Sequence, residues 1–352
     1  MKILVLAGGL SNERNVSLAS GAMVTNALRK KGHETALVDL FMGVGDDETF
    51  ESLSKKDVPS EWLTVAVKAP DLKEIINSRE YKSDSVFGKN VLGLCREADI
   101  VFIAMHGGCG EDGRVQAALD MFGIPYTGSD YLASAIAMNK DLAKELVLTA
   151  GVRTPEWKRI FIADVSVAES IMSETAVPVV VKVPDSGSSV GVYIAKSEDE
   201  LKNALKENIG KTVMIEQYIS GREIQMAFLE GKPLPSIEIV ANSEFYNYES
   251  KYQKGIATEI TPAEITEEQE AEMGELLMKV VNAVGLRIYS RADFIIDGEG
   301  KIWFIEINSL PGMTSTSLVP QEARAAGIEF EDLCEIIVTD GISRKVGIQK
   351  YL

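Results

Sequence analysis

The alternation of hydrophobic and polar positions predicts an α/β unit in the first third of the chain. Apolar runs at 2–7, 34–39 and 99–105 are typical of buried strands, and a helical stretch near 17–32 separates the first two. Strands that alternate with helices favour a parallel sheet, so we expect a βαβ arrangement here.

A second unit is expected beyond a helical segment from about 129 to 150, which ends at Ala150-Gly151, where glycine is a natural stop. The elements predicted after it are strands at 177–183, 190–195 and 212–216, helices at 197–207 and 266–284, and strands at 290–296 and 301–308.

The last two of these runs carry the most informative polar residues. Side chains alternate along a strand, so Arg291 and Asp293 share one face of the first run, and Glu306 and Asn308 share one face of the second. An antiparallel register that pairs Asp293 with Glu306 also pairs Arg291 with Asn308. One cation, two carboxylates and an amide would then lie on one surface.

Two facing carboxylates repel each other unless a positive charge separates them. A Mg²⁺ ion with oxygen ligands from Asp293, Glu306 and Asn308 would remove the repulsion and keep its other positions for water and nucleotide phosphates. The alternative is a solvated polar sheet face without a metal. The hairpin alone therefore suggests a metal site without proving one.

Composition and charge narrow the function classes. At 352 residues and 45% hydrophobic content, the chain is long enough for two or three domains. Its net charge of −17 argues against broad binding to a nucleic-acid backbone. No apolar run approaches the roughly 20 residues that span a bilayer, and the chain opens on a strand instead of a signal peptide, which favours the cytosol. Three scattered cysteines indicate neither a disulfide framework nor a structural zinc site, and two histidines exclude a histidine-based metal site.

Three further segments have the composition of ligand-binding loops. Lys182 ends an apolar strand and precedes the Gly/Ser loop 186–189, which is no Walker A motif because the lysine comes first and a strand follows. The loop is either a cover for phosphates or a plain hairpin tip. Glu216 begins a segment that suits a nucleotide base and ribose, or a linker. The glycine-rich run 106–113 follows the strand at 99–105, at the edge where open α/β sheets bind ligands.

The turn Gly8-Gly9 follows the first strand and suits a small anionic or polar ligand, with Ser11 or Asn12 expected to cap the next helix. A dehydrogenase with a nicotinamide at this turn is a weak alternative, because the three-glycine spacing is missing.

Together these segments resemble the ATP-grasp enzymes and, within them, the D-alanine–D-alanine ligases. The resemblance covers nearly the whole chain through blocks in the right order: 8–17, 106–113, 126–129, 138–140, 182–191, 216–223, 248–252 and 311–320. It implies an α/β fold, α+β overall, of the ATP-grasp type. The implied domains are an N-terminal parallel-sheet βαβ domain over 1–128, a small central domain over 129–216 and a C-terminal mixed-sheet domain over 217–352.

The resemblance also implies the ligands. The residues that would surround ATP are Lys140, Lys182, Ser188, Ser189, Glu216, Tyr218, Ile219, Glu223 and Lys251. The metal ligands would be Asp293, Glu306 and Asn308, holding two Mg²⁺ ions, with Mn²⁺ as a substitute. A homodimer is expected from the resemblance alone, with no nucleic acid or membrane as partner.

In the implied reaction, the carboxylate of one D-alanine attacks ATP, and the amine of a second attacks the acyl phosphate, giving D-alanyl-D-alanine for peptidoglycan precursors. Glu13 would meet the first ammonium and form a hydrogen-bonded triad with Ser188 and Tyr252. The implied catalytic residues are Glu13, Ser188, Tyr252, Arg291 and Gly312, and the implied substrate-binding residues are Glu13, Ser17, His106, Arg291, Ser317 and Leu318.

Three positions depart from the family or bear on the product. Asn15 stands where the family usually carries a carboxylate, and Val183 where a proline commonly follows the lysine. Tyr252 stands where relatives that make an ester commonly carry phenylalanine, which favours a dipeptide and leaves D-serine open as the second substrate. A nucleotide-binding regulatory protein without turnover is the alternative from another class.

Overall fold

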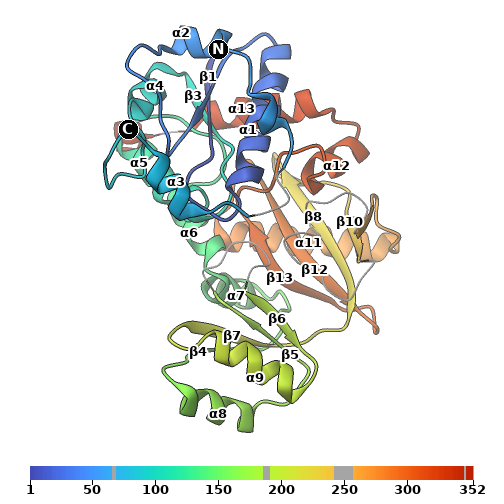
Figure 1. Ribbon diagram of the computed structural model, residues 1–352. Coiled ribbons are helices and arrows are strands. Elements are labelled where there is room, and N and C mark those ends of the chain that lie inside the picture. The colour runs from blue at the N-terminus through green and yellow to red at the C-terminus, as the bar shows by residue number, and fades with distance from the viewer. Residues whose placement is uncertain (66–68, 185–190, 242–256, 345, 352) are drawn as a thin grey trace.

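The computed structural model describes residues 1–65, 69–184, 191–241, 257–344 and 346–351, which form three sheets (Figure 1). The strands are β1 (Lys2–Ala7), β2 (Glu34–Asp39), β3 (Ile100–Ile103), β4 (Trp157–Phe161), β5 (Val179–Lys182), β6 (Val192–Ala195), β7 (Thr212–Gln217), β8 (Gly221–Leu229), β9 (Lys232–Pro233), β10 (Ile237–Ala241), β11 (Ala257–Ile260), β12 (Tyr289–Asp297) and β13 (Ile302–Asn308). The helices are α1 (Arg14–Lys30), α2 (Phe50–Lys55), α3 (Leu72–Ser78), α4 (Val91–Glu97), α5 (Arg114–Met121), α6 (Tyr131–Met138), α7 (Lys140–Thr149), α8 (Val165–Glu174), α9 (Glu198–Glu207), α11 (Glu267–Val284), α12 (Leu318–Ala325) and α13 (Phe330–Ile342), with 3₁₀ turns η1 (Ser60–Leu63), η2 (Gly108–Gly110) and η3 (Gly347–Tyr351).

The N-terminal sheet has the strand order β2-β1-β3, and both pairings are parallel, which confirms the predicted βαβ arrangement. The apolar side chains of β1 and β3 are buried together with residues from the other end of the chain, including Leu310, Met313 and Leu333. Because α12 and α13 contribute to this core, the first and last parts of the chain pack as one body.

The C-terminal sheet has the order β11-β10-β8-β12-β13, with β9 paired to β8, and every one of these pairings is antiparallel. The mixed sheet expected here is therefore antiparallel in the residues the structure describes. The reason is local: β12 returns through a tight turn into β13, and strands joined by a hairpin run antiparallel. Helix α11 packs on this sheet and has the bounds predicted for it, within one residue. Thr266 forms its capping box with Gln269, and Gly285 ends it in the left-handed conformation.

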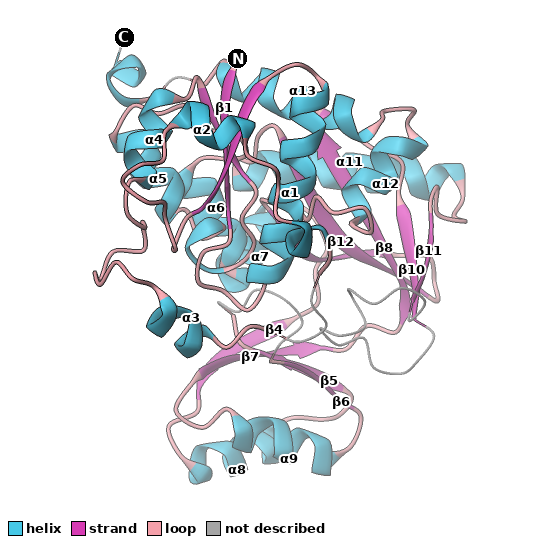
Figure 2. Cartoon of the chain, turned by 45° about the horizontal axis from the view of Figure 1, so that its top comes forward, coloured by secondary structure: helices cyan, strands magenta, loops and turns pink. Residues whose placement is uncertain are grey.

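The central sheet, β4-β7-β5-β6, is antiparallel and projects from the rest of the molecule (Figure 1). Helices α8 and α9 cover its outer face and close a small core of their own (Figure 2). Ser197 forms the capping box of α9 with Glu200, so this helix lies where it was predicted.

The helical segment predicted at 129–150 is two helices. Asn139 leaves the helical conformation, with ψ at 94°, and its side chain accepts from the Leu142 backbone to cap α7. Buried residues of both helices, among them Ala133 and Val147, pack in the core of the C-terminal sheet. These two helices therefore share the core of the C-terminal sheet, whereas the buried residues of the central core lie between Ile162 and Ile215. The domain boundary at residue 129 stays a prediction.

The start of α1 also differs from expectation. Neither Ser11 nor Asn12 caps it, because the helix begins at Arg14 with Glu13 in the cap position. The Ser11 hydroxyl instead donates to the His106 carbonyl oxygen at 2.6 Å and accepts from the Glu13 backbone at 3.2 Å. This turn is thus held to the end of β3.

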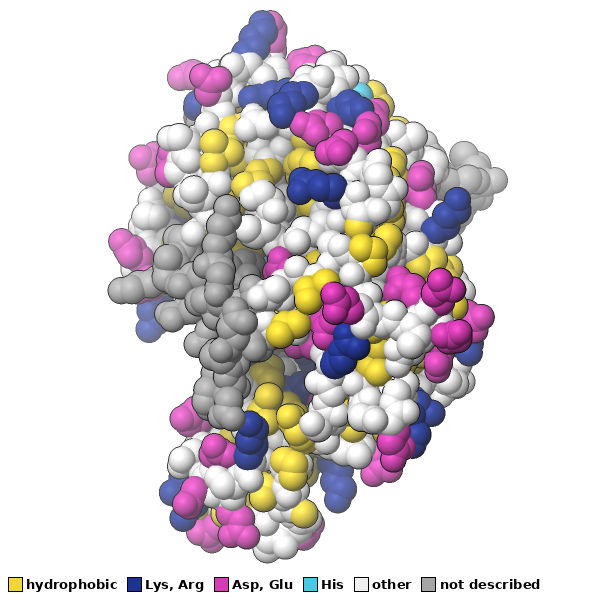
Figure 3. All heavy atoms as spheres, turned by 90° about the vertical axis from the view of Figure 1, so that its right-hand side faces the viewer, with side chains coloured by type: hydrophobic (Ala, Val, Ile, Leu, Met, Phe, Trp, Pro, Cys, Tyr) yellow, Lys and Arg dark blue, Asp and Glu magenta, His cyan; other side chains and the backbone are white. Residues whose placement is uncertain are grey.

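The surface carries charges of both signs, which are interspersed on the face shown in Figure 3. Among the helices of the described residues, none has both the length and the apolar character that crossing a bilayer requires.

Candidate functional site

A cleft of about 110 Å³ lies where the N-terminal loops, the start of α7, strands β12 and β13 and the loop before α12 meet. The site residues predicted from sequence that line it are Glu13, His106, Lys140, Arg291, Glu306, Asn308, Gly312, Ser317 and Leu318. The first and last of these residues, Glu13 and Leu318, lie at opposite ends of the chain, and the shared core brings them together.

The β12–β13 hairpin has the register predicted from sequence: Arg291 pairs with Asn308 and Asp293 with Glu306. The guanidinium of Arg291 donates to the Asp293 carboxylate at 2.8 and 3.1 Å. Burial disfavours the charged guanidinium, but the Asp293 carboxylate outweighs burial and raises the pKa of Arg291. Lys140 lies 3.4 Å from the Glu306 carboxylate, so both acids face a cation.

The donor atoms on this face suit a hard divalent cation, because two carboxylates and an amide supply oxygen ligands. The side-chain nitrogen of Asn308 is buried and has no hydrogen-bond partner within the described residues. This nitrogen is a donor, so the atom of Asn308 that would bind a cation is its amide oxygen. The described ranges contain no group of three His, Cys, Asp or Glu side chains placed to hold a metal ion. The set proposed here has two such side chains, Asp293 and Glu306, and its third ligand would be the amide of Asn308.

Toward the central sheet, the Glu216 carboxylate is paired with two lysines, Lys182 and Lys144. The Lys144 side chain is fully buried, and burial lowers its pKa, an effect to which the charge of Lys182 adds. Burial likewise lowers the pKa of Lys182 to about 8, opposed by Glu306. Sequence reasoning missed Lys144; its spacing of one helical turn from Lys140 was the available signal.

Three other predicted nucleotide residues within the described ranges, Tyr218, Ile219 and Glu223, are not among those that line the cleft. Tyr218 and Ile219 follow β7, and the Ile219 side chain is buried. Glu223 lies on β8 and accepts from the side chain of Gln225 at 3.1 Å. The remaining predicted positions, Ser188, Ser189, Lys251 and Tyr252, lie outside the described residues.

Ser17 holds the first turn and does not line the cleft. Its side chain is fully buried, and its hydroxyl donates to the Ala104 carbonyl at 2.8 Å and accepts from the Gly8 backbone at 2.8 Å. The hydroxyl therefore donates and accepts within the protein, and the substrate contact expected for Ser17 stays a prediction.

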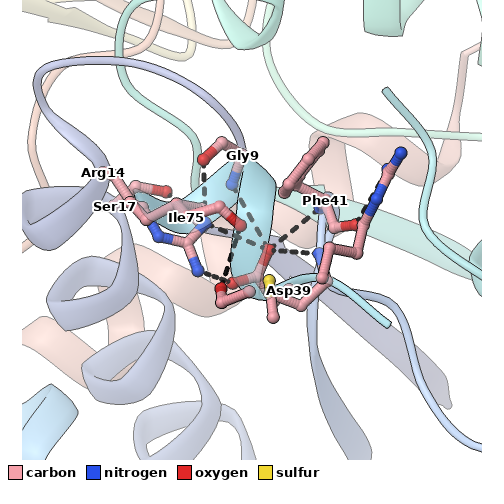
Figure 4. A network of polar contacts seen from close by, with 10 residues as sticks. Gly9, Arg14, Ser17, Asp39, Phe41 and Ile75 are labelled. Carbon is pink, nitrogen blue, oxygen red and sulfur yellow. Dashed lines mark hydrogen bonds and ion pairs between the residues drawn. The ribbon is translucent and has the colours of Figure 1, made fainter. Parts of the chain in front are cut away.

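Next to this turn, Arg14 and Asp39 form a buried ion pair (Figure 4). Arg14 also donates to the Gly9 carbonyl at 2.8 Å, while Asp39 accepts from the backbone of Phe41 at 2.9 Å. The pair joins the end of β2 to the loop that carries Glu13. The loop before Glu13 is held through Gly9, and the helix after it is held through Arg14, so the position of Glu13 is fixed from both directions along the chain.

Glu111 is a second acid at the amino-acid end of the cleft, beside Glu13, and it was not predicted from the sequence. It lines the cleft and accepts from the Gly107 backbone at 2.6 Å. Burial, together with the negative charge of Glu13, raises the pKa of Glu111 to about 8, so it is largely protonated at neutral pH. An acid within the glycine-rich run 106–113 was the signal available in the sequence.

The central antiparallel sheet contributes Lys182, helix α7 contributes Lys140, and the C-terminal antiparallel sheet contributes the carboxylate hairpin. This arrangement is that of the ATP-grasp class. Solved structures agree with this class along the whole chain. The D-alanine–D-alanine ligase of Bacillus anthracis complexed with ATP has a TM-score of 0.73 and 28% identity, covering 100% of this chain and 98% of that one. The VanG D-Ala:D-Ser ligase of Enterococcus faecalis has a TM-score of 0.72 and 25% identity, with 96% and 98% covered.

The chain belongs to the D-alanine–D-alanine ligase family. The model of the family's N-terminus matches residues 2–129, and the model of its C-terminus matches residues 146–339. Among curated relatives, the D-alanine–D-alanine ligase of Pediococcus pentosaceus is 42% identical over 345 residues, covering 96% of this chain and 97% of the relative. That of Lacticaseibacillus casei is 40% identical over 342 residues, covering 96% and 95%.

Proposed function

We propose that this protein is an ATP-dependent ligase that joins two D-alanines through an acyl phosphate to give D-alanyl-D-alanine for peptidoglycan precursors. The observation that carries the proposal is the β12–β13 register, which puts Arg291 and Asp293 opposite Asn308 and Glu306. Arg291, Glu306 and Asn308 line the cleft, where Lys140 lies 3.4 Å from Glu306. Phosphoryl transfer needs mainly alignment and charge neutralisation, which this set supplies.

On the nucleotide side, Lys140 and Lys182 neutralise phosphate charge, and the segment after Glu216 binds the base and ribose. Support comes from the burial of Lys182 and Glu216 at 5% and 2% exposure, since buried charges act in a low dielectric. The residues proposed to contact ATP are Lys140, Lys182, Ser188, Ser189, Glu216, Tyr218, Ile219, Glu223 and Lys251.

Asp293, Glu306 and Asn308 would hold two Mg²⁺ ions, for which Mn²⁺ would substitute. The ions would neutralise phosphate charge and orient the nucleotide. The protein's own part is to keep the three donor groups on one face, which the hairpin does.

On the amino-acid side, Glu13 meets the ammonium of the first D-alanine. The second D-alanine places its carboxylate at the start of α12, where Ser317 is the N-cap and Leu318 the first helical residue. Backbone N–H groups and the helix dipole favour an anion there. Ser188 and Tyr252 are proposed to complete the triad with Glu13.

Arg291 and the Gly312 N–H stabilise the charge that develops as the amine attacks. Glycine is required at 312, because a Cβ there would lie 2.6 Å from the Ser317 hydroxyl. The backbone can therefore approach a substrate without a side chain in the way.

A homodimer and a cytosolic location complete the proposal. Exposed apolar side chains gather near η3, at Met121, Phe122, Leu132 and Ile348, and offer a surface for a second copy. All three cysteines are free and buried, as is usual in a reducing compartment. Light scattering would test the dimer. Neither a nucleic acid nor a membrane is proposed as a partner.

The test is release of ADP from ATP and Mg²⁺ with single and paired D-amino acids, with mass spectrometry of the product. Turnover with D-alanine alone that yields the dipeptide supports the proposal. Turnover only with D-alanine plus D-serine would move the chain toward the chemistry named for the VanG ligase. No turnover with any pair would leave a nucleotide-binding protein without catalysis.

A further inference from the structure

The side chain of His106 is enclosed by protein at the end of β3. It is 5% exposed, its Nδ1 lies 3.0 Å from the Leu310 carbonyl oxygen, and its Nε2 lies 2.8 Å from the hydroxyl of Ser20 in α1. Both ring nitrogens are therefore occupied, although the ring borders the cleft.

The direction of each hydrogen bond follows from the groups involved. A carbonyl oxygen only accepts, so Nδ1 carries the proton and donates to Leu310. The other nitrogen, Nε2, then accepts from the Ser20 hydroxyl. The Ser20 oxygen in turn accepts from the Met313 backbone N–H at 3.2 Å. The chain of hydrogen bonds runs from Met313 through Ser20 and His106 to Leu310.

This chain holds the loop that carries Gly312 from both sides, because Leu310 and Met313 flank Pro311-Gly312 in sequence. The backbone of His106 is also held: its carbonyl accepts from Ser11 at 2.6 Å, and the Ser11 oxygen accepts from the Glu13 N–H. His106 thus links the loop that carries Glu13 to the loop that carries Gly312.

We propose that Ser20 and His106 are a positioning pair that sets the Gly312 amide against Glu13, and that His106 acts neither as a general acid nor as a general base. The inference rests on the proposed function, because it assigns the pair a task in that reaction. It replaces the direct substrate contact expected for His106 from the family resemblance.

The electrostatic surroundings agree with a neutral ring. Burial lowers the pKa of His106 to about 4; the hydrogen bond to Leu310 opposes this shift, and the charge of Arg291 adds to it. At neutral pH the ring therefore stays uncharged, and the hydrogen-bond directions given above are kept.

The kinetic test uses Ser20→Ala, which removes a hydroxyl that touches no substrate in the proposed site. We expect kcat to fall about 10²-fold, as for a small misplacement of reacting groups, with little change in the KM for ATP. His106→Asn keeps a donor near the Nδ1 position and loses the bond to Ser20. The double variant should be no worse than the worse single one, because each residue acts through the other.

The pH–rate profile separates positioning from proton transfer. All three variants should keep the ascending limb of the wild-type profile. Wild-type kcat in Ser20→Ala, or loss of that limb only in His106→Asn, would overturn the inference. Ser134→Ala is the matched control, because Ser134 is a buried helical serine whose hydroxyl has no hydrogen-bond partner among the described residues; its kinetics should be those of the wild type.

A second readout does not depend on turnover. The Met313 amide donates to Ser20, so its hydrogen exchange should accelerate in Ser20→Ala and stay unchanged in Ser134→Ala. Unchanged exchange at Met313 would contradict the pair. A wild type without ligase activity would defeat the proposed function, yet this exchange experiment would still decide whether the pair exists. If Ser20→Ala does not fold, Ser20→Cys keeps the volume and a weak donor, and intermediate exchange and kcat are expected.

Discussion

The two ends of the cleft are built by different means. The amino-acid end contains Glu13, His106 and Gly312, on loops that leave one continuous hydrophobic core formed by the first and last parts of the chain. The nucleotide end lies between that body and the central sheet, which has a separate small core. There, the contact is made by charges: Glu216 from β7 is paired with Lys144 from α7.

This difference predicts which kinetic constant, kcat or the KM for ATP, depends on each end of the cleft. Hydrogen bonds between neutral groups have defined directions, so they set the positions of reacting atoms at the amino-acid end. Ion pairs between buried charges are strong but less directional, so they suit a surface that must receive phosphates. Changes at the first end should therefore act mainly on kcat, and changes at the second mainly on the KM for ATP.

The largest effect is expected for Arg291→Ala, at the point where the two ends meet. Removing one stabilising donor in such a site costs about 10²–10³-fold in kcat. ATP binding, measured by calorimetry, should persist. Arg287→Ala, at an exposed position just before β12, is the control. Unchanged turnover in Arg291→Ala would refute the role of this residue.

The two cores can be compared with matched leucines. Leu28 and Leu205 are both fully buried, the first in the large core and the second in the central one. Each change to alanine should cost about 2–5 kcal/mol. Hydrogen exchange should accelerate only within residues 157–217 for Leu205→Ala, but across the N-terminal sheet for Leu28→Ala. Equal acceleration everywhere in both variants would mean that the two units unfold as one.

A smaller effect is expected for Lys144→Met, which keeps the length of the side chain and removes its charge. Glu216 would then have Lys182 as its remaining cation, and Lys182 would be less available to phosphate. We expect the KM for ATP to rise about tenfold, or roughly 1.4 kcal/mol, with kcat changed less. Lys158→Met, at an exposed position of β4, is the control. A lower melting temperature with an unchanged KM would make Lys144 a purely structural counter-ion.

The smallest effect concerns Glu322, which accepts from the Ala227 backbone at 2.9 Å and braces α12 at the amino-acid end. Burial raises its pKa from 4.5 to about 8. The folded state then binds a proton that the unfolded state has lost, so this contribution is complete below pH 4.5 and disappears as the pH rises through 8.

Between pH 7 and 8 the free energy of unfolding of the wild type should therefore fall by about 1 kcal/mol relative to Glu322→Gln, which has no proton to lose. Denaturant titration at both pH values measures this difference. Glu272→Gln, at an exposed position of α11, is the matched control. Parallel pH dependence in wild type and Glu322→Gln would show that Glu322 is ionised in the fold.

Local periodicity determined much of this protein from sequence alone. Alternation along a strand was sufficient to place Arg291 and Asp293 on one face and Glu306 and Asn308 on another, because side-chain direction repeats every two residues. The register that brings the two faces together is the one considered from the sequence. The helices predicted at 197–207 and 266–284 are α9 and α11, and the capping boxes that start them are formed by near neighbours in sequence. Nine of the residues that line the cleft were also predicted, since several blocks in order resemble one family.

Only the tertiary structure decided what depends on contacts between distant segments. His106 reaches Leu310 across 204 positions, and the hydroxyl of Ser17 reaches Ala104 across 87, so both side chains hold distant segments of the protein together. The raised pKa of Glu111 and the pairing of Lys144 arise from burial, which no local pattern contains. Sequence determined which groups the site possesses, and packing decided which of them remain available for chemistry, because hydrogen-bond partners and dielectric surroundings exist only once the chain has folded.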